Sequence, residues 1–237
     1  MALLDHLDEL RSRLVRVAIV YVVLLAACWA VSGPILAFLM RPIQRHLFEG
    51  DDIVFIHLTE PFMIYLKASA VAALFIGAPF ALYHLWSFVA PGLYRRERRL
   101  VIPFLFFGTL FFVGGGAFGY YVATPVAASW LIGLGEEFKA AITLRSAFQF
   151  EARVIIGMGA VFELPIVIFF LSRIGVVTPR FLMRHFRSAV LIIALLAAVI
   201  TPTGDMLTMS VFAGPMILLY LLGVVIAAIF GKKPETE

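Results

Sequence analysis

Long runs of apolar residues are the feature that most constrains the fold of this chain. A helix needs about 20 apolar residues to cross the hydrocarbon core of a bilayer, and runs of about that length recur along the sequence. Of the 237 residues, 62% are hydrophobic and 14% are charged, and the mean hydropathy is +1.01. A water-soluble domain of this length cannot bury so much apolar surface. We therefore expect an all-α, polytopic integral membrane protein.

Six apolar segments are candidates for membrane spans. The last apolar block, residues 186–230, is too long for one span, and the sequence Thr-Pro-Thr-Gly-Asp at 201–205 interrupts it. Proline lacks a backbone donor and glycine permits a turn, so this block is predicted to be a hairpin of two spans. The first of the two is short, and we expect local bilayer thinning or burial against neighbours there. The predicted single domain, residues 1–237, has spans at about 14–40, 62–90, 100–123, 154–171, 186–200 and 206–230.

Basic residues gather on one side of these spans. Thirteen of the 19 lysines and arginines lie before or just inside the first span, in or beside the second and fourth connections, or after the last span. Cytoplasmic loops carry the excess of Lys and Arg, so both termini are expected in the cytoplasm. The other side has longer connections, in which residues 136–150 are predicted to form an amphipathic helix on the membrane surface. Basic clusters beside apolar segments indicate topology, and no nucleic-acid partner is expected.

Glu163 lies near the middle of the fourth apolar segment, two residues before Pro165. An ionised carboxylate at that depth costs on the order of 3 kcal/mol, so the group is expected to be protonated, paired or turned toward a water-filled cavity. Pro165 also removes one helical hydrogen bond and exposes a carbonyl to other partners. A packing role through an internal hydrogen bond is one interpretation of Glu163. A functional role is the other.

Two further acidic residues, Glu9 and Glu97, stand among arginines at the cytoplasmic side. Glu9 precedes Arg13 by four residues on a predicted amphipathic helix, a spacing typical of an ordinary intrahelical ion pair. Glu97 is flanked by two arginines on each side and would at least relieve their repulsion. A carboxylate can also accept a guanidinium group in a two-point, charge-assisted contact. Together the two acids could hold two guanidinium groups.

Several short motifs give the chain a resemblance to one family over nearly its whole length. They are HLDELRSRL at 6–14, RPI at 41–43, EPF at 60–62, WSFVAPGL at 86–93, ERR at 97–99, FELP at 162–165, and Thr201-Pro202 with Asp205. In these motifs the chain resembles the TatC family, the receptor components of the twin-arginine protein translocases. The resemblance implies a cup-shaped bundle of six spans in the cytoplasmic membrane.

The resemblance also implies a function and the residues that carry it. Glu9 and Glu97 would receive the paired arginines of a signal peptide on folded cargo, with Phe88 beside them, and Glu163 would face the concave side. Partner subunits of the TatA and TatB types, each with a single span, would dock near the last turn, at Thr201 and Asp205. The family often has Gln one turn past the aspartate, where this chain has Thr208 and Met209. Docking through Thr208 or backbone groups is therefore expected.

The same resemblance implies export driven by the proton-motive force, several copies of the chain in a lipid-embedded complex, and no cofactor or metal. A proton-coupled transporter of small solutes using Glu163 is the alternative, because one buried acid can relay protons. The sequence has no evident inverted repeat, which fits a transporter poorly. An intramembrane protease is disfavoured, because the sequence lacks a second membrane aspartate and other hydrolytic groups. The chain is predicted not to be an enzyme.

Overall fold

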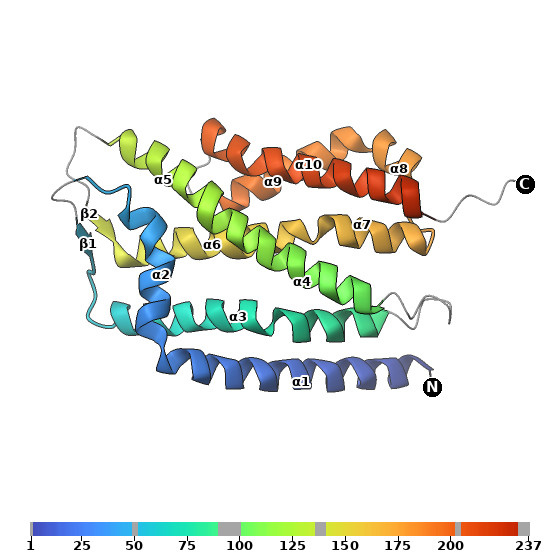
Figure 1. Cartoon of the computed structure of the whole chain (residues 1–237), viewed down its shortest axis with the longest axis horizontal. Coiled ribbons are helices and arrows are strands. Elements are labelled where there is room, and N and C mark those ends of the chain that lie inside the picture. Colours follow the sequence, from blue (N-terminus) through green and yellow to red (C-terminus); the bar gives the residue numbers. More distant parts are fainter. Residues whose placement is uncertain (1, 49–51, 90–100, 136–140, 202–204, 232–237) are drawn as a thin grey trace, which may run out of the picture.

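The computed structural model describes residues 2–48, 52–89, 101–135, 141–201 and 205–231, which form an elongated bundle of helices (Figure 1). Most of the helices run along the long axis, whereas α2 runs across it near one end. In chain order the elements are α1 (Ala2–Ala30), α2 (Ser32–Gln44), β1 (Asp52–Val54), α3 (Glu60–Val89), α4 (Val101–Phe118), a π-helical turn (Gly119–Ala123), α5 (Thr124–Gly133), β2 (Ala141–Thr143), α6 (Leu144–Phe162), α7 (Leu164–Arg173), α8 (Pro179–Arg184), α9 (Phe186–Ile200) and α10 (Met206–Phe230).

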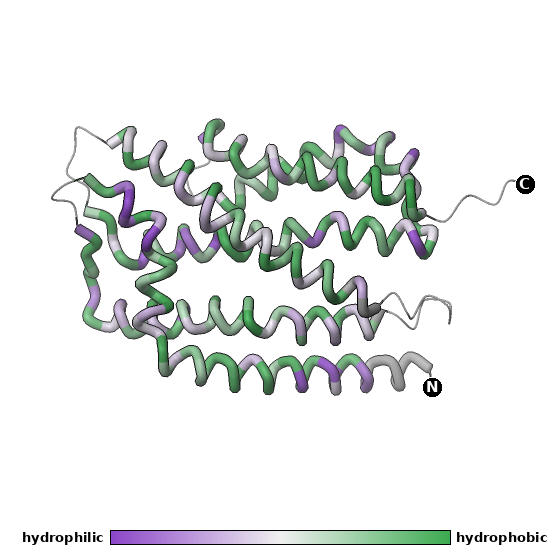
Figure 2. Tube along the Cα trace, in the orientation of Figure 1, coloured by the Kyte–Doolittle hydropathy of each residue, from purple (hydrophilic) through white to green (hydrophobic). Residues whose placement is uncertain are grey.

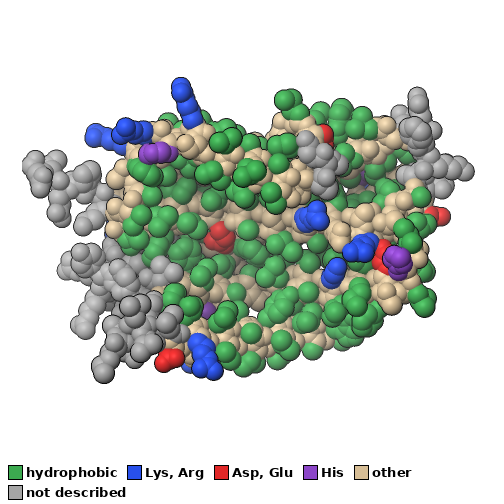
Figure 3. Space-filling model, turned by 180° about the vertical axis from the view of Figure 1, so that it is seen from behind, with side chains coloured by type: hydrophobic (Ala, Val, Ile, Leu, Met, Phe, Trp, Pro, Cys, Tyr) green, Lys and Arg blue, Asp and Glu red, His purple; other side chains and the backbone are tan. Residues whose placement is uncertain are grey.

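Five helical stretches are long and apolar enough to cross a membrane, which confirms an all-α integral membrane protein. They are Asp8–Ala30, Glu60–Phe88, Leu105–Gly133, Leu144–Arg173 and Met206–Phe230. Hydrophilic residues concentrate toward the two ends of the bundle (Figure 2), and hydrophobic side chains cover the middle of the face seen in Figure 3. The exposed surface is therefore suited to lipid over most of its length.

The apolar helix α9, which corresponds to the fifth predicted span, is shorter than these five stretches. Its 15 residues span about 22 Å at 1.5 Å per residue, against a hydrocarbon core of about 30 Å. Only Ile193 and Ala197 of α9 are buried. Two alternatives were expected for this short segment, local bilayer thinning or burial against neighbours. The structure does not show the burial. The bounds of α9 and α10 are those that the sequence indicates for the last two apolar segments.

The first apolar segment, predicted to run unbroken through residues 14–40, is divided at Val31. That residue has a non-helical backbone (φ −120°, ψ 26°), and α2 then leaves the direction of α1. The cause is Pro34, because a proline ring collides with the carbonyl four residues earlier in a continuous helix, here that of Ala30. The first long helix therefore ends at Ala30.

The predicted amphipathic surface helix at residues 136–150 is wrong for its described part. Residues 136–140 lie outside the described residues, Ala141–Thr143 form β2, and α6 begins at Leu144. Thr143 caps that helix by accepting a hydrogen bond from the Ser146 N–H at 3.2 Å. Because the cap starts the helix here, residues 144–150 belong to the long α6–α7 stretch.

The third apolar segment also extends further than predicted, to Gly133. Within it the Thr124 N–H bonds to the Gly119 carbonyl, five residues back, which makes a π-helical turn. Pro125 explains the wide turn, because it cannot donate to the Tyr121 carbonyl and its ring crowds that group.

Two contacts join segments that are far apart in sequence at the end of the bundle opposite the start of α1. Strands β1 and β2 pair in parallel, with Ile53 opposite Ile142. Beside them, Glu60 at the start of α3 accepts hydrogen bonds from the backbone N–H of Ile56 (3.1 Å), of His57 (3.4 Å) and of Arg145 at the start of α6 (2.8 Å).

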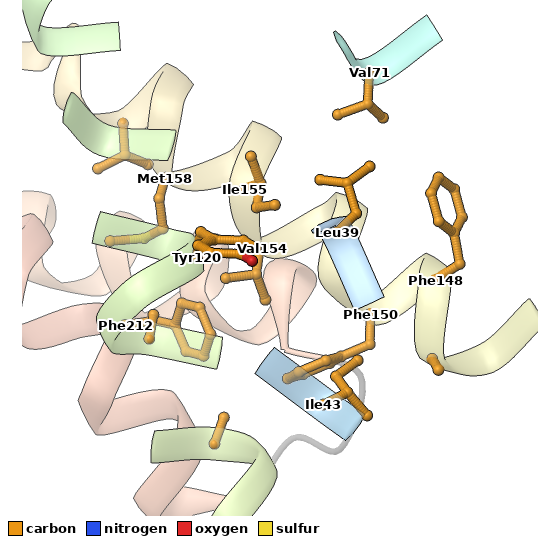
Figure 4. Close-up of a cluster of buried hydrophobic side chains, with 14 of the residues drawn as sticks. Leu39, Ile43, Val71, Tyr120, Phe148, Phe150, Val154, Ile155, Met158 and Phe212 are labelled. Atoms are coloured by element: carbon orange, nitrogen blue, oxygen red, sulfur yellow. The ribbon is translucent and has the colours of Figure 1, made fainter. Parts of the chain in front are cut away.

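The main core lies where α2, α3, α6, the π-helical turn and α10 meet, with side chains of α6 at its centre (Figure 4). Helices α4 and α6 approach closely, because Gly115 and Gly119 of α4 and its continuation face α6 one turn apart. Small residues at this spacing let helix backbones meet in a membrane. A Cβ on Gly115 would lie 2.5 Å from the Met158 carbonyl oxygen.

Candidate functional site

The first predicted site residue, Glu9, lies on α1 at the end of the bundle where the chain begins. Helices α1 and α3 run side by side in opposite directions, so the start of α1 lies beside the end of α3 (Figure 1). Glu9 Oε1 accepts from Arg13 Nε at 3.0 Å and from Arg13 Nη2 at 2.6 Å. This confirms the expected intrahelical ion pair. The Glu9 side chain keeps 40% of its surface exposed.

Phe88 lies in the last turn of α3, half-buried, at the same end of the bundle. The third predicted residue, Glu97, falls in 90–100, outside the described residues. The structure thus brings Glu9 and Phe88 to neighbouring helix ends, and Glu97 follows α3 by eight positions in the sequence.

His84 is a further polar residue of this region that the sequence did not single out. It lies one turn before Phe88 on α3, and it is 8% exposed. Its ring packs edge-on against the ring of Phe80, with the two ring centroids 4.5 Å apart. The positive charges of Arg13 and Arg16 act on the imidazole across the contact between α1 and α3. The sequence shows only a histidine within an apolar helix. Such a histidine is more often a core residue than a ligand.

Glu163 occupies the junction between α6 and α7, which agrees with its predicted position beside a helix interruption. Its backbone carbonyl accepts from the N–H groups of Ile166 and Val167, both at 3.0 Å, so α7 restarts directly after it. Both carboxylate oxygens are shielded from solvent and have no hydrogen-bond partner among the described residues. They lie against Gly108 of α4, where an added Cβ would be 3.5 Å from Oε2.

Glu151 is a second buried acid in the α6–α7 stretch, 0% exposed, and sequence reasoning missed it. It lies between the predicted surface helix at 136–150 and the fourth span predicted from about residue 154, whereas α6 already begins at Leu144. The buried hydroxyl of Thr124 is close enough to influence the carboxylate, although neither group completes a hydrogen bond of normal geometry within the described part of the chain.

Thr201, Asp205 and Thr208 lie at the end of α9 and the start of α10. Thr201 ends α9, and its hydroxyl donates to the Ala197 carbonyl at 2.8 Å. Asp205 caps α10 by accepting from the Thr208 N–H at 2.8 Å, and the Thr208 hydroxyl donates to the same carboxylate. Thr201 is 3% exposed and Thr208 is 0% exposed. Their hydrogen bonds therefore stabilise the last turn of α9 and the first turn of α10.

No group of three or more His, Cys, Asp or Glu side chains suited to a metal ion occurs in the described ranges. The polar groups above are also dispersed, with Glu9, Glu163 and Asp205 on different elements. Such an arrangement offers contacts for charged and apolar peptide segments.

Comparisons with known proteins agree with this description. Residues 5–215 match the family model described as "Sec-independent protein translocase protein (TatC)". The TatC protein of Koribacter versatilis is 42% identical over 236 residues, which cover 98% of this chain and 87% of the relative. That of Campylobacter jejuni is 37% identical over 235 residues, covering 98% and 96%. A crystal structure described as "Twin Arginine Translocase Receptor- TatC" superposes with a TM-score of 0.85 at 29% identity, covering 94% of this chain and 98% of that one.

Proposed function

This chain belongs to the TatC family of Sec-independent protein translocase proteins, and on that premise we propose that it is the receptor for twin-arginine signal peptides. It is a multi-pass membrane component of a translocase and not an enzyme. The observation that carries the proposal is the likeness of almost the whole chain to the solved receptor, in fold as well as in sequence. The receptor binds the signal peptide and assembles with partner subunits, and it forms no covalent intermediate.

The proposed site for the two arginines consists of Glu9 and Glu97, with Phe88 beside them. The partly exposed side chain of Glu9 near the start of α1 supports this assignment, as does the half-buried Phe88 at the end of the neighbouring helix. A guanidinium group pairs with a carboxylate through two parallel hydrogen bonds. Because Arg13 already pairs with one carboxylate oxygen of Glu9, Glu97 is expected to contribute more of the binding free energy.

The proposed topology has six spans with both termini in the cytoplasm, in the cytoplasmic membrane. In support, α1 begins and α10 ends at the same end of the bundle (Figure 1). Thirteen of the 19 basic residues belong to the side of the membrane that the sequence predicts to be cytoplasmic. The fifth span in chain order is α9, and its length of about 22 Å requires the bilayer to thin beside it. All six spans form one domain.

The proposed partners are single-span subunits of the TatA and TatB types, which assemble with several copies of this chain to export folded cargo at the expense of the proton-motive force. Their docking region is the turn between α9 and α10. Because Thr201 and Thr208 are buried, a partner would contact the exposed outer faces of α9 and α10 instead of these side chains. Glu163 is proposed to bind a partner helix or the inserted signal peptide after α4 moves away from it.

The receptor assignment is tested by peptide binding to the purified protein in nanodiscs. A twin-arginine signal peptide should bind more tightly than its twin-lysine counterpart, because lysine cannot make the planar two-point contact. Glu97→Ala should weaken binding by about tenfold or more, since a charge-assisted hydrogen bond contributes about 1.5–3 kcal/mol. Glu97→Lys should be worse than Glu97→Ala, and Glu97→Gln nearest to wild type.

Asp8→Ala is the matched control for Glu9→Ala, because it removes an exposed carboxylate from the adjacent position. It should leave peptide affinity unchanged, whereas Glu9→Ala should weaken binding less than Glu97→Ala does. An arginine preference that survives removal of both Glu9 and Glu97 would show that the peptide is recognised elsewhere.

Topology is tested by labelling single cysteines with a membrane-impermeant maleimide after Cys28→Ser. Positions 51 and 137 should react from outside the cell, and positions 96 and 180 should react only after the membrane is opened. A cytoplasmic position 51 would rule out the six-span arrangement.

A further inference from the structure

A basic cavity opens beside α2, at the end of the bundle opposite the start of α1. Its volume is about 340 Å³, and its charged lining comes from Arg41 in the last turn of α2 and Arg45 at the C-cap. Both side chains are exposed. Among the described residues that line the cavity none is acidic, and neither arginine forms a salt bridge within the described ranges.

The walls of this cavity are held in a fixed shape. The Tyr120 hydroxyl donates to the Phe38 carbonyl at 2.7 Å, and the two rings stack with their centroids 4.5 Å apart. His46 Nδ1 donates to the Pro42 carbonyl at 2.7 Å, which fixes the imidazole against the end of α2. The charges of Arg41 and Arg45 act on the Tyr120 hydroxyl. Both guanidinium groups therefore belong to one positively charged pocket with an aromatic floor.

An apolar groove of about 440 Å³ adjoins the basic cavity, and the two share Phe38, Tyr120 and Tyr121. From Tyr120 the groove continues along α4 to Val113, a distance of about 10 Å at 1.5 Å per residue. Its floor includes Leu39 and Val71, which point toward each other from α2 and α3 (Figure 4). The site thus presents positive charge at its mouth and a hydrophobic slot that leads toward the middle of the bundle.

We propose that this site binds an anionic phospholipid, with the phosphate on Arg41 and Arg45 and one acyl chain in the groove. Arginine pairs with phosphate through charge-assisted, two-point hydrogen bonds. The groove surrounds an acyl chain with apolar side chains, and the close contacts add dispersion attraction to the charge pairing. A free phosphate would use the arginines alone, so the adjoining apolar groove selects the lipid. The site lies at the opposite end of the bundle from Glu9 and does not depend on peptide recognition.

Native mass spectrometry of the full chain in a neutral detergent tests the proposal, with phosphatidylglycerol, phosphatidylcholine and inorganic phosphate as probes. One phosphatidylglycerol should be retained at least about tenfold more tightly than phosphatidylcholine. The Arg41→Gln/Arg45→Gln double variant should abolish that preference. Lys67→Gln/Arg153→Gln is the matched control, because it removes two exposed positive charges that do not line either cavity; it should keep the preference.

The apolar half of the site is tested with Ala117→Phe, which fills the groove, against Leu110→Phe on an exposed part of α4 that does not line it. The first should weaken phosphatidylglycerol binding by about tenfold and the second by less than about twofold. Displacement of the lipid by millimolar inorganic phosphate would instead identify a site for soluble anions. Loss of binding in Ala117→Phe with no effect of the arginine substitutions would identify a slot for any apolar chain. Either result overturns the proposal.

Discussion

The contact between α4 and α6 gives a sharp prediction for a single added methyl group. In Gly115→Ala the new Cβ would lie 2.5 Å from the Met158 carbonyl oxygen and 2.7 Å from the Phe162 Cβ. Carbon and carbonyl oxygen normally approach to about 3.3–3.6 Å, so the two helices must separate by on the order of 1 Å. The obstructing oxygen belongs to a helix backbone and cannot rotate away as a side chain would.

This separation is expected to lower the free energy of unfolding by about 1–3 kcal/mol. That range is typical of an extra methyl group forced into a packed interior, and a gap of 0.5–1 Å forfeits about a quarter to a half of the dispersion energy of each contact that it opens. Gly114 is the matched control, because a Cβ there meets no atom within 4 Å. Gly114→Ala should leave stability unchanged or raise it by up to about 1 kcal/mol, the difference in helix propensity between the two residues.

The assay is reversible unfolding in mixed micelles with increasing dodecyl sulfate, followed by circular dichroism. The midpoint for Gly115→Ala should fall below wild type, and that for Gly114→Ala should match or exceed it. Equal midpoints for the two variants would mean that α4 and α6 are not in backbone contact at Gly115, and the reasoning would fail.

Two further substitutions test the polar groups. Glu163→Ala should leave the protein inserted and folded but weaken transport or crosslinking to a partner helix. Glu163→Gln should have a milder effect if hydrogen bonding matters more than charge. Failure of the Ala variant to accumulate in the membrane would assign Glu163 to packing. Asp205→Ala removes the N-cap of α10 and should cost about 0.5–2 kcal/mol of stability, measured by the same unfolding assay, with Asp205→Asn close to wild type. An Asp205→Ala variant with the stability of the wild type would exclude the capping role.

Hydropathy and proline positions were sufficient to predict much of this fold. The bounds of α9 and α10 follow from the break at residues 201–205, because a proline and a glycine in five residues end one apolar helix and allow another to begin. The turn at Glu163 likewise agrees with Pro165 two residues later. Apolar length alone could not indicate direction, however. At Pro34 the chain stays apolar while α2 turns across the bundle, so residues 32–40 were joined to the preceding span.

The candidate site was predicted less completely. The spacing of Glu9 and Arg13 predicted their ion pair, which depends only on local helix geometry. Glu151 was missed because its burial depends on where α6 starts, and that start is set by the Thr143 cap and by the pairing of β2 with β1. The neighbourhood of His84 depends on how α1 packs on α3, which no local pattern in the sequence specifies.

The hydrogen bond between Glu60 and the Arg145 N–H also has a consequence for the synthesis of the protein. The two residues are 85 positions apart in the chain, so at about 5–20 residues per second a ribosome needs roughly 4–17 s to make the second after the first. During that interval Glu60 can accept only from its neighbours Ile56 and His57. The hydrogen bond from α6 therefore completes this end of the bundle only after the segment from α1 to α3 has been synthesised.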